Sequence, residues 1–321
     1  MSERSVLYDE PGPRTRRITV IASIVATIVV IAGIYFFVYL PLDAYDQFSA
    51  KKWDPLINPS NELFPLVWNR IGEGLQATVI GAVLAIIASL LFGSALAVAR
   101  LQLQSARQLH HVNQSPAVAI VLRAATVVLN AMARVFVEFF RGLPVVITIY
   151  FVARGLPEFG VDFDTLWYLV IGLALYNSVV IAEILRSGMS GLPGGQYEAA
   201  SALGLSSFKT IRLILLPQSF RIMLPALISQ IVVIFKDTSL AALISYEDLL
   251  NVGFQIFNLL NNPIQVLIVL AVIYVVINYA LSKLAEDLQR RIARGRRPAG
   301  PADNPLWISG QPRSSGIRGR R

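Results

Sequence analysis

The chain has 321 residues, of which 55% are hydrophobic and 15% charged, and its formal net charge is +8. Its mean hydropathy is +0.59, and several apolar runs reach the ~20 residues that a helix needs to cross a bilayer, so we expect an all-α, polytopic membrane bundle. The basic residues lie beside these runs and form no aromatic-interleaved face, which argues against nucleic-acid binding. The absence of cysteine excludes disulfides, thiolate metal sites and cysteine nucleophiles. His110 and His111 are adjacent in a polar stretch, which is more typical of a solvated loop than of a metal site.

The N-terminal region begins with a polar, basic segment, residues 1–17, followed by an uninterrupted apolar run at residues 18–40. This run is too long for the apolar part of a signal peptide, and the sequence Pro41-Leu42-Asp43-Ala44 is a poor cleavage site. We therefore expect an N-terminal transmembrane helix over 18–40. Prolines and aromatic residues over 41–70 then indicate an extracytoplasmic loop at the membrane interface.

Five further membrane spans follow from the apolar runs. They are expected near residues 71–99, 135–155, 166–185, 222–244 and 263–281. The stretch 117–132 is also apolar, but Arg123 argues against a separate crossing, because a charge near the middle of a lipid-exposed helix costs at least ~2.5 kcal/mol. We interpret that stretch as an interfacial helix or a cytoplasmic lead-in to the third span, with a separate crossing as the alternative. Gly142 and Pro144 should bend the third span.

Lysine and arginine are unevenly distributed between the expected connections. Residues 157–165 and 246–262 contain neither, whereas basic residues occur in the connection 187–221 and after the last span. The positive-inside rule then places this connection and both termini in the cytoplasm. The basic tail, residues 283–321, is poor in apolar residues beyond about 298, so we expect disorder there. Its arginines suit contact with anionic membrane lipid, although a solubilising tail is the plainer interpretation.

The connection 187–221 contains a polar stretch from Gln196 to Pro217, QYEAASALGLSSFKTIRLILLP, between two apolar segments. Its apolar positions recur at helical spacing, which predicts two short helices. Gly204 offers the left-handed conformation that ends a helix, and Ser206 can cap the next one. Such a helix pair with small residues suits insertion into a groove on another protein, although polar helical loops between spans are common.

Signals of catalysis are missing from the sequence. It contains no phosphate-binding G-x-x-x-x-G-K-[ST] loop, no G-x-S-x-G motif and no histidine-rich metal set. We therefore expect no enzymatic activity, cofactor or metal in this chain, and instead a solute path lined by a few polar groups.

The most informative polar groups lie in the fifth span. Lys236, Asp237, Thr238 and Ser239 fall about 12–15 residues into it, near mid-membrane at ~1.5 Å per residue. Because successive side chains on a helix point ~100° apart, Lys236 and Asp237 should have different partners. These residues either border the solute path or form a buried ion pair or helix-end cap that fixes the bundle.

Other polar residues within spans carry less information. Asn177 and Ser178 could hydrogen-bond a solute, although polar side chains between membrane helices more often join the helices. Glu183 and Arg186 are three residues apart, which favours an intrahelical ion pair. Arg141 is more typical of an interfacial anchor than of a solute contact.

Part of this chain resembles the permease subunits of polar amino-acid ABC importers, the histidine, glutamine and glutamate permease family. Glu198-Ala199-Ala200, with Gly204 four residues later, resembles the EAA signature of that family, and Ile214, Leu216 and Pro217 continue the pattern. Three blocks carry the wider resemblance: VEFFRGLP at 137–144, IAEILRSGMSGLPGGQYEAASALG at 181–204 and LPQSFRIMLPALISQIVVIFKDTSL at 216–240.

The resemblance implies a type I ABC importer permease fold, with a five-span core over 71–282 and one extra N-terminal span. It implies that the stretch from Gln196 to Pro217 forms coupling helices, with Glu198 and Gly204 at the joint with a separate ATPase subunit that binds ATP-Mg. The expected assembly has two permease subunits, two ATPase subunits and an extracytoplasmic solute-binding protein in a bacterial plasma membrane.

The chain departs from the family at several positions. The family usually has a threonine at the position of Leu143, an aromatic residue near Val180 and an asparagine at the position of Ser229. The loop over 103–131 is longer in this chain than is usual in the family. The longer arms are similar to those of glutamate-type permeases of high-GC Gram-positive bacteria, a hint of an acidic amino acid as cargo. The alternatives are a stand-alone secondary transporter or channel, and a scaffold or sensor without transport.

Overall fold

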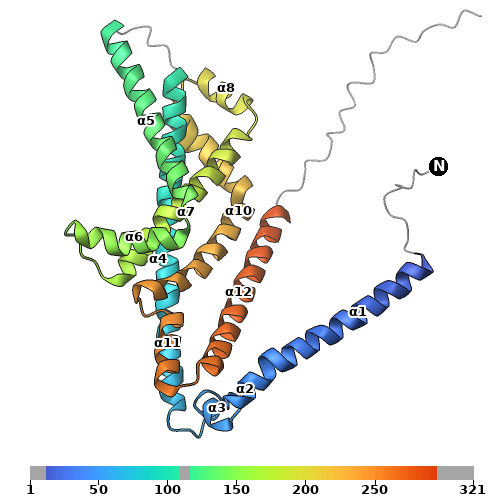
Figure 1. Ribbon diagram of the computed structural model, residues 1–321. Helices are drawn as coiled ribbons and strands as arrows, with labels where there is room; N and C mark the ends of the chain where they lie inside the picture. Colours follow the sequence, from blue (N-terminus) through green and yellow to red (C-terminus); the bar gives the residue numbers. More distant parts are fainter. Residues whose placement is uncertain (1–11, 109–115, 295–321) are drawn as a thin grey trace, which may run out of the picture.

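The computed structural model describes residues 12–108 and 116–294. Throughout these residues the regular structure is helical (Figure 1). The α-helices are α1 (Pro13–Ile34), α2 (Leu40–Ala44), α3 (Ala50–Ile57), α4 (Phe64–Gln108), α5 (Pro116–Gly142), α6 (Val145–Glu158), α7 (Thr165–Ser190), α8 (Gly195–Ala202), α9 (Ser207–Thr210), α10 (Leu216–Asp237), α11 (Leu249–Leu260) and α12 (Pro263–Arg294). Two π-helical turns, η1 (Tyr35–Tyr39) and η2 (Ile211–Leu215), and a 3₁₀ segment, η3 (Thr238–Ile244), join neighbouring helices.

Within the described residues, six helical stretches are long and apolar enough to cross a membrane. They cover 13–44, 64–106, 120–142, 165–190, 207–244 and 263–291. The predicted all-α bundle with about six spans is therefore confirmed.

The third of these spans lies at a different place in the sequence from the one we predicted. The crossing helix is 120–142, whereas we expected 135–155 and an interfacial helix over 117–132. The expected bend at Pro144 is a complete break, because Pro144 adopts an extended conformation before α6. With 14 residues, α6 extends only ~21 Å, too short to cross. Arg123 lies in the first turn of the span rather than near its middle, where its side chain can reach the interface.

Helix α7 is the centre of the bundle. It packs against α4, α6 and α10, and its side chains Leu169, Leu173 and Leu185 are fully buried. Glycines permit the close approach of its neighbours: a Cβ added at Gly93 of α4 would lie 2.7 Å from Ile181 Cγ2. Small residues at helix crossings are typical of membrane bundles, in which lipid-exposed surfaces provide little hydrophobic driving force for association.

The N-terminal region contacts the bundle through its second half alone. Helix α1 has no buried residue and leaves the bundle at an angle (Figure 1). The expected loop over 41–70 is partly helical, because the apolar side chain of Leu56 in α3 packs against the start of α4, where Trp68 Nε1 donates to Leu56 O at 3.0 Å. Asn262 Nδ2 adds a hydrogen bond to Lys52 O, also at 3.0 Å.

Two further boundaries differ from the prediction. The connection 246–262 contains α11, whose apolar face packs against α4 and α12. Helix α12 continues to Arg294, well into the predicted tail, because helix formers and an ion pair between Lys283 and Glu286 at 3.0 Å extend it. The predicted disorder from about residue 298 lies outside the described residues.

Candidate functional site

The EAA-like stretch forms two short helices at one end of the bundle, with α3 and α11 at the other end (Figure 1). Helix α8 ends in a Schellman motif: Leu205 N donates to Ala200 O at 3.1 Å and Gly204 N to Ser201 O at 3.0 Å. Gly204 has a φ of +71°, and the Ser206 side chain accepts from Lys209 N. The local prediction of a left-handed end at Gly204 and a cap at Ser206 is confirmed.

Helix α8 presents an exposed surface. Glu198 and Ala199 are exposed, and Glu198 forms no ion pair with any described residue, whereas Ala200 is buried. Leu203 at the end of α8 is 80% exposed. Helix α8 and its C-terminal turn are therefore accessible to another protein.

The second helix does not end but continues into α10 through η2. Leu216 N donates to Ile211 O, one residue further back than in an α-helix. Pro217, which follows, has no N–H to restore the normal ladder. Ile214 and Leu216 are half-buried and Pro217 is exposed, so the predicted coupling residues of this half form the elbow between α9 and the fifth span.

Hydrogen bonds link α8 to α10 and α10 to α7. Gln218 Nε2 of α10 donates to Gln196 Oε1 of α8 at 3.3 Å. Ser219 Oγ, fully buried, donates to Leu185 O of α7 at 2.7 Å. A force on α8 therefore acts on the fourth and fifth spans together.

The polar residues predicted for the solute path in the fourth span form hydrogen bonds to other residues of the bundle. Asn177 is fully buried; its Nδ2 donates to Leu173 O at 2.9 Å, and its Oδ1 accepts from Gln230 Nε2 of α10 at 2.7 Å. Ser178 Oγ donates to Leu175 O at 3.1 Å. In this conformation the asparagine joins two spans, as polar side chains between membrane helices commonly do.

The polar residues of the fifth span lie where α10 ends and η3 begins. Lys236 is exposed and Asp237 half-buried, and the two form no ion pair with each other, as their angular separation predicts. Thr238 Oγ1 donates to Phe235 O at 2.6 Å and Ser239 Oγ to Lys236 O at 2.9 Å. Lys236 and Asp237 both lack an ion-pair partner among the described residues, and Lys236 is the more exposed of the two.

A charged cluster near the α8 end of the bundle combines residues far apart in the chain. Glu183 of α7 accepts from Arg100 of α4 at 3.0 Å and is also paired with Arg186, as expected. Its side chain lines a cavity of about 470 Å³ together with Ser187 and Arg141. The pairing with Arg100 was not predictable from spacing, because 83 residues separate the two positions.

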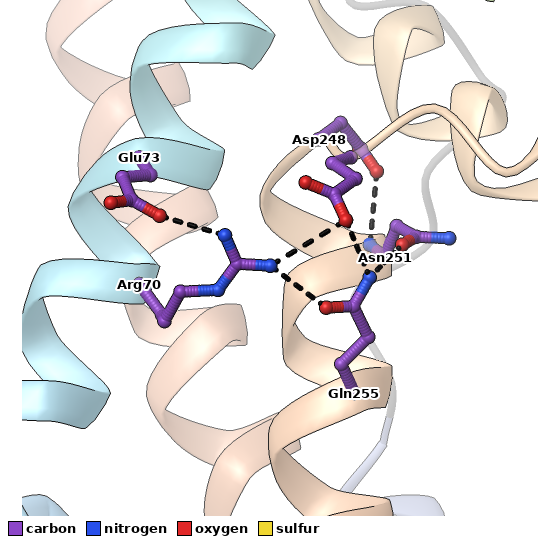
Figure 2. Close-up of polar contacts among 6 residues, drawn as sticks. Arg70, Glu73, Asp248, Asn251 and Gln255 are labelled. Atoms are coloured by element: carbon purple, nitrogen blue, oxygen red, sulfur yellow. Dashed lines mark hydrogen bonds and ion pairs between the residues drawn. The ribbon is translucent and has the colours of Figure 1, made fainter.

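A second cluster lies at the opposite end, between α4 and α11 (Figure 2). Arg70 NH1 donates to Glu73 Oε2 at 2.7 Å and NH2 to Gln255 Oε1 at 2.9 Å, while Glu247 Oε1 lies 3.6 Å away. Asp248 caps α11 by accepting from Asn251 N at 2.9 Å. Burial raises the pKa of Asp248 to about 6, against the opposing effect of its backbone hydrogen bonds.

No group of three or more potential metal ligands occurs among the residues that the structure describes. His110 and His111 lie outside them.

Comparison with known proteins decides the family. The model of the binding-protein-dependent transport system inner membrane component matches residues 115–294, more than half of the chain. The chain belongs to this family. The matched residues include α5 to α12, and with them the EAA-like stretch and Glu183, Arg186 and Arg141 of the charged cluster, but not Arg100.

Curated relatives within the family extend the match. The chain is 36% identical over 259 residues to the glutamate transport system permease protein GluD of Corynebacterium glutamicum, covering 79% of this chain and 85% of the relative. It is 35% identical over 175 residues to the probable glutamine ABC transporter permease protein GlnP of Bacillus subtilis, covering 53% and 80% respectively.

A solved structure titled as an amino acid ABC transporter with histidines has a TM-score of 0.56 at 24% identity. It covers 72% of this chain and 98% of the other, and it supports the permease fold. The family is the membrane component of its transporters, which is not itself catalytic, and the chain is a multi-pass membrane protein.

Proposed function

We propose that this chain is the membrane subunit of an ATP-driven importer of polar amino acids, with α8 and the turn at Gly204 docked into a separate ATPase subunit. The observation that carries the proposal is the exposed helix α8, which is hydrogen-bonded to α10 of the fifth span, while α10 is in turn hydrogen-bonded to α7 of the fourth span. Docking of α8 into a groove would therefore move two spans as a unit, as alternating access by rocking requires.

The proposed assembly has two permease subunits, two ATPase subunits that bind ATP-Mg, and an extracytoplasmic solute-binding protein. The positive-inside rule supports a cytoplasmic α8 and cytoplasmic termini. The cluster at Arg70 then faces outward, where it joins α4 to α11 beside the entrance that a binding protein would use.

We propose glutamate, or another acidic amino acid, as the cargo. The 36% identity to the glutamate permease supports it. So does the charge around the cavity of about 470 Å³, since Arg141 lines it and its single carboxylate, Glu183, is already paired with Arg100 and Arg186. The excess positive charge suits a solute with a second carboxylate.

Coupling is tested in the complete transporter reconstituted in liposomes with its ATPase and binding protein. Glu198→Lys reverses the charge of the docking surface, and Gly204→Asp places a side chain where φ is +71°. Both variants should insert normally but lose uptake and substrate-stimulated ATP hydrolysis. Glu62→Lys, a charge reversal at the other end of the bundle of an exposed residue that forms no ion pair with any described residue, is the matched control and should retain coupling.

Normal stimulated hydrolysis in both variants would refute the docking role of α8. Uptake by the purified chain alone, without nucleotide, would instead support a stand-alone secondary transporter or channel. Cargo is tested separately: Arg141→Gln should weaken inhibition of uptake by glutamate more than by glutamine, whereas Arg134→Gln on the same helix should alter neither.

A further inference from the structure

An apolar groove runs along α4 between α5 and α7. It has a volume of about 590 Å³, and eleven of its twelve lining residues are apolar, including Ala88, Ala95 and Ala99 of α4 and Trp167 of α7. The hydroxyl of the twelfth, Ser178, is already donated to Leu175 O. The groove therefore offers a ligand almost entirely apolar contact.

A second cavity, of about 410 Å³, continues the groove toward α9. It shares Ala95 and Ala99 with the first and is also lined by Gln102, Phe208 and Arg212. Gln102 Nε2 is buried and has no hydrogen-bond partner among the described residues. Arg212 is exposed and forms no ion pair with any of them. This end thus holds one buried donor and one free cationic donor, and no carboxylate lines it.

We propose that the groove and this donor pair together bind an anionic phospholipid. Its acyl chain lies along Ala88 to Ala99, and its phosphate oxygens accept from Gln102 and Arg212. The stretch from Ala88 to Ala99 extends ~17 Å along α4, close to the half of a ~30 Å hydrocarbon core that belongs to one leaflet. Gln102 lies one helical turn further, at the depth of the headgroup.

The dimensions of the groove distinguish a lipid chain from a helix of another subunit. A volume of about 590 Å³ spread over ~17 Å gives a cross-section of roughly 35 Å². A helix about 10 Å across occupies roughly 80 Å², more than twice as much. Lys209, exposed and three residues before Arg212, adds positive charge on the same side of the η2 elbow.

The single tryptophan in the groove, Trp167, provides a reporter. The full chain with Trp53, Trp68 and Trp307 replaced by Phe is reconstituted in phosphatidylcholine nanodiscs, and acyl-brominated phosphatidylglycerol or phosphatidylcholine is added in steps. We expect phosphatidylglycerol to quench Trp167 at an about fivefold lower mole fraction than phosphatidylcholine does. This factor corresponds to the roughly 1 kcal/mol that a basic residue contributes near anionic lipid.

Variants of the donor pair complete the test. Arg212→Gln should abolish the preference for phosphatidylglycerol, while Arg221→Gln, another exposed arginine that does not line the cavity, should retain it. Gln102→Leu should weaken quenching by both lipids, because its amide donates to the phosphate that both share. Equal quenching by the two lipids in the unsubstituted background, or a preference that survives Arg212→Gln, would overturn the proposal. So would loss of all quenching when the ATPase and second permease are added, because a protein segment would then fill the groove.

Discussion

The crossing of α4 and α7 at Gly93 allows a quantitative test of the fold. A Cβ at this position would lie 2.7 Å from Ile181 Cγ2 and 2.9 Å from Ser178 O. The carbonyl oxygen belongs to the backbone of α7 and cannot rotate away, so Gly93→Ala must separate the two helices. Overpacking costs about 1–3 kcal/mol, of which better helix propensity returns about 1 kcal/mol. We expect a net loss of roughly 0–2 kcal/mol in the free energy of unfolding.

Gly72→Ala is the matched control on the same helix, because nothing lies within 4 Å of its added Cβ. It should gain about 0.5–1 kcal/mol from helix propensity alone. Thermal unfolding of both variants and the parent chain is followed by circular dichroism in one detergent, and we expect the order Gly72→Ala, parent, Gly93→Ala. A Gly93→Ala midpoint equal to or above that of Gly72→Ala would refute the close crossing.

Two further predictions concern ionisable groups. The pKa of Asp248 is raised from 3.8 to about 6 in the folded chain, so protonated Asp248 favours folding more than the carboxylate does. The free energy of unfolding should therefore fall by at most about 3 kcal/mol as pH rises from about 4 to 6 and stay constant above. Asp248→Asn keeps the α11 cap and should remove this decline in unfolding measured from pH 4 to 7. Lys236→Met should lower the rate of uptake while the transporter still assembles, and unchanged uptake kinetics would assign Lys236 a purely structural role.

The parts of the structure that were predictable depend on short-range signals. The end of α8 at Gly204 and the cap at Ser206 follow from residues two positions apart, each with its own backbone preference. The family resemblance likewise depends on contiguous blocks. Such signals stay valid whatever the tertiary arrangement, which explains why the EAA-like stretch was predicted in detail.

The parts that were missed depend on tertiary contacts or on a choice between neighbouring apolar windows. Residues 117–155 are apolar almost throughout, and the break at Pro144 decides which part crosses. The pairs Arg100–Glu183 and Arg70–Gln255 join residues separated by 83 and 185 positions. No periodicity links such positions, so only the packing of α4 against α7 and α11 reveals them.

Helix α7 carries polar ties to its neighbours at three levels. Glu183 forms an ion pair with Arg100 of α4. Asn177 accepts a hydrogen bond from Gln230 of α10, and Leu185 O accepts one from Ser219, which also belongs to α10. In a bilayer, apolar contact alone discriminates little between a neighbouring helix and lipid, so hydrogen bonds and close small-residue contacts hold spans in register. One tie lies within two turns of the C-terminal end of α7 and another near its middle, so we expect a displacement that reaches α7 through α8 and α10 to move the centre of the bundle rather than bend its end.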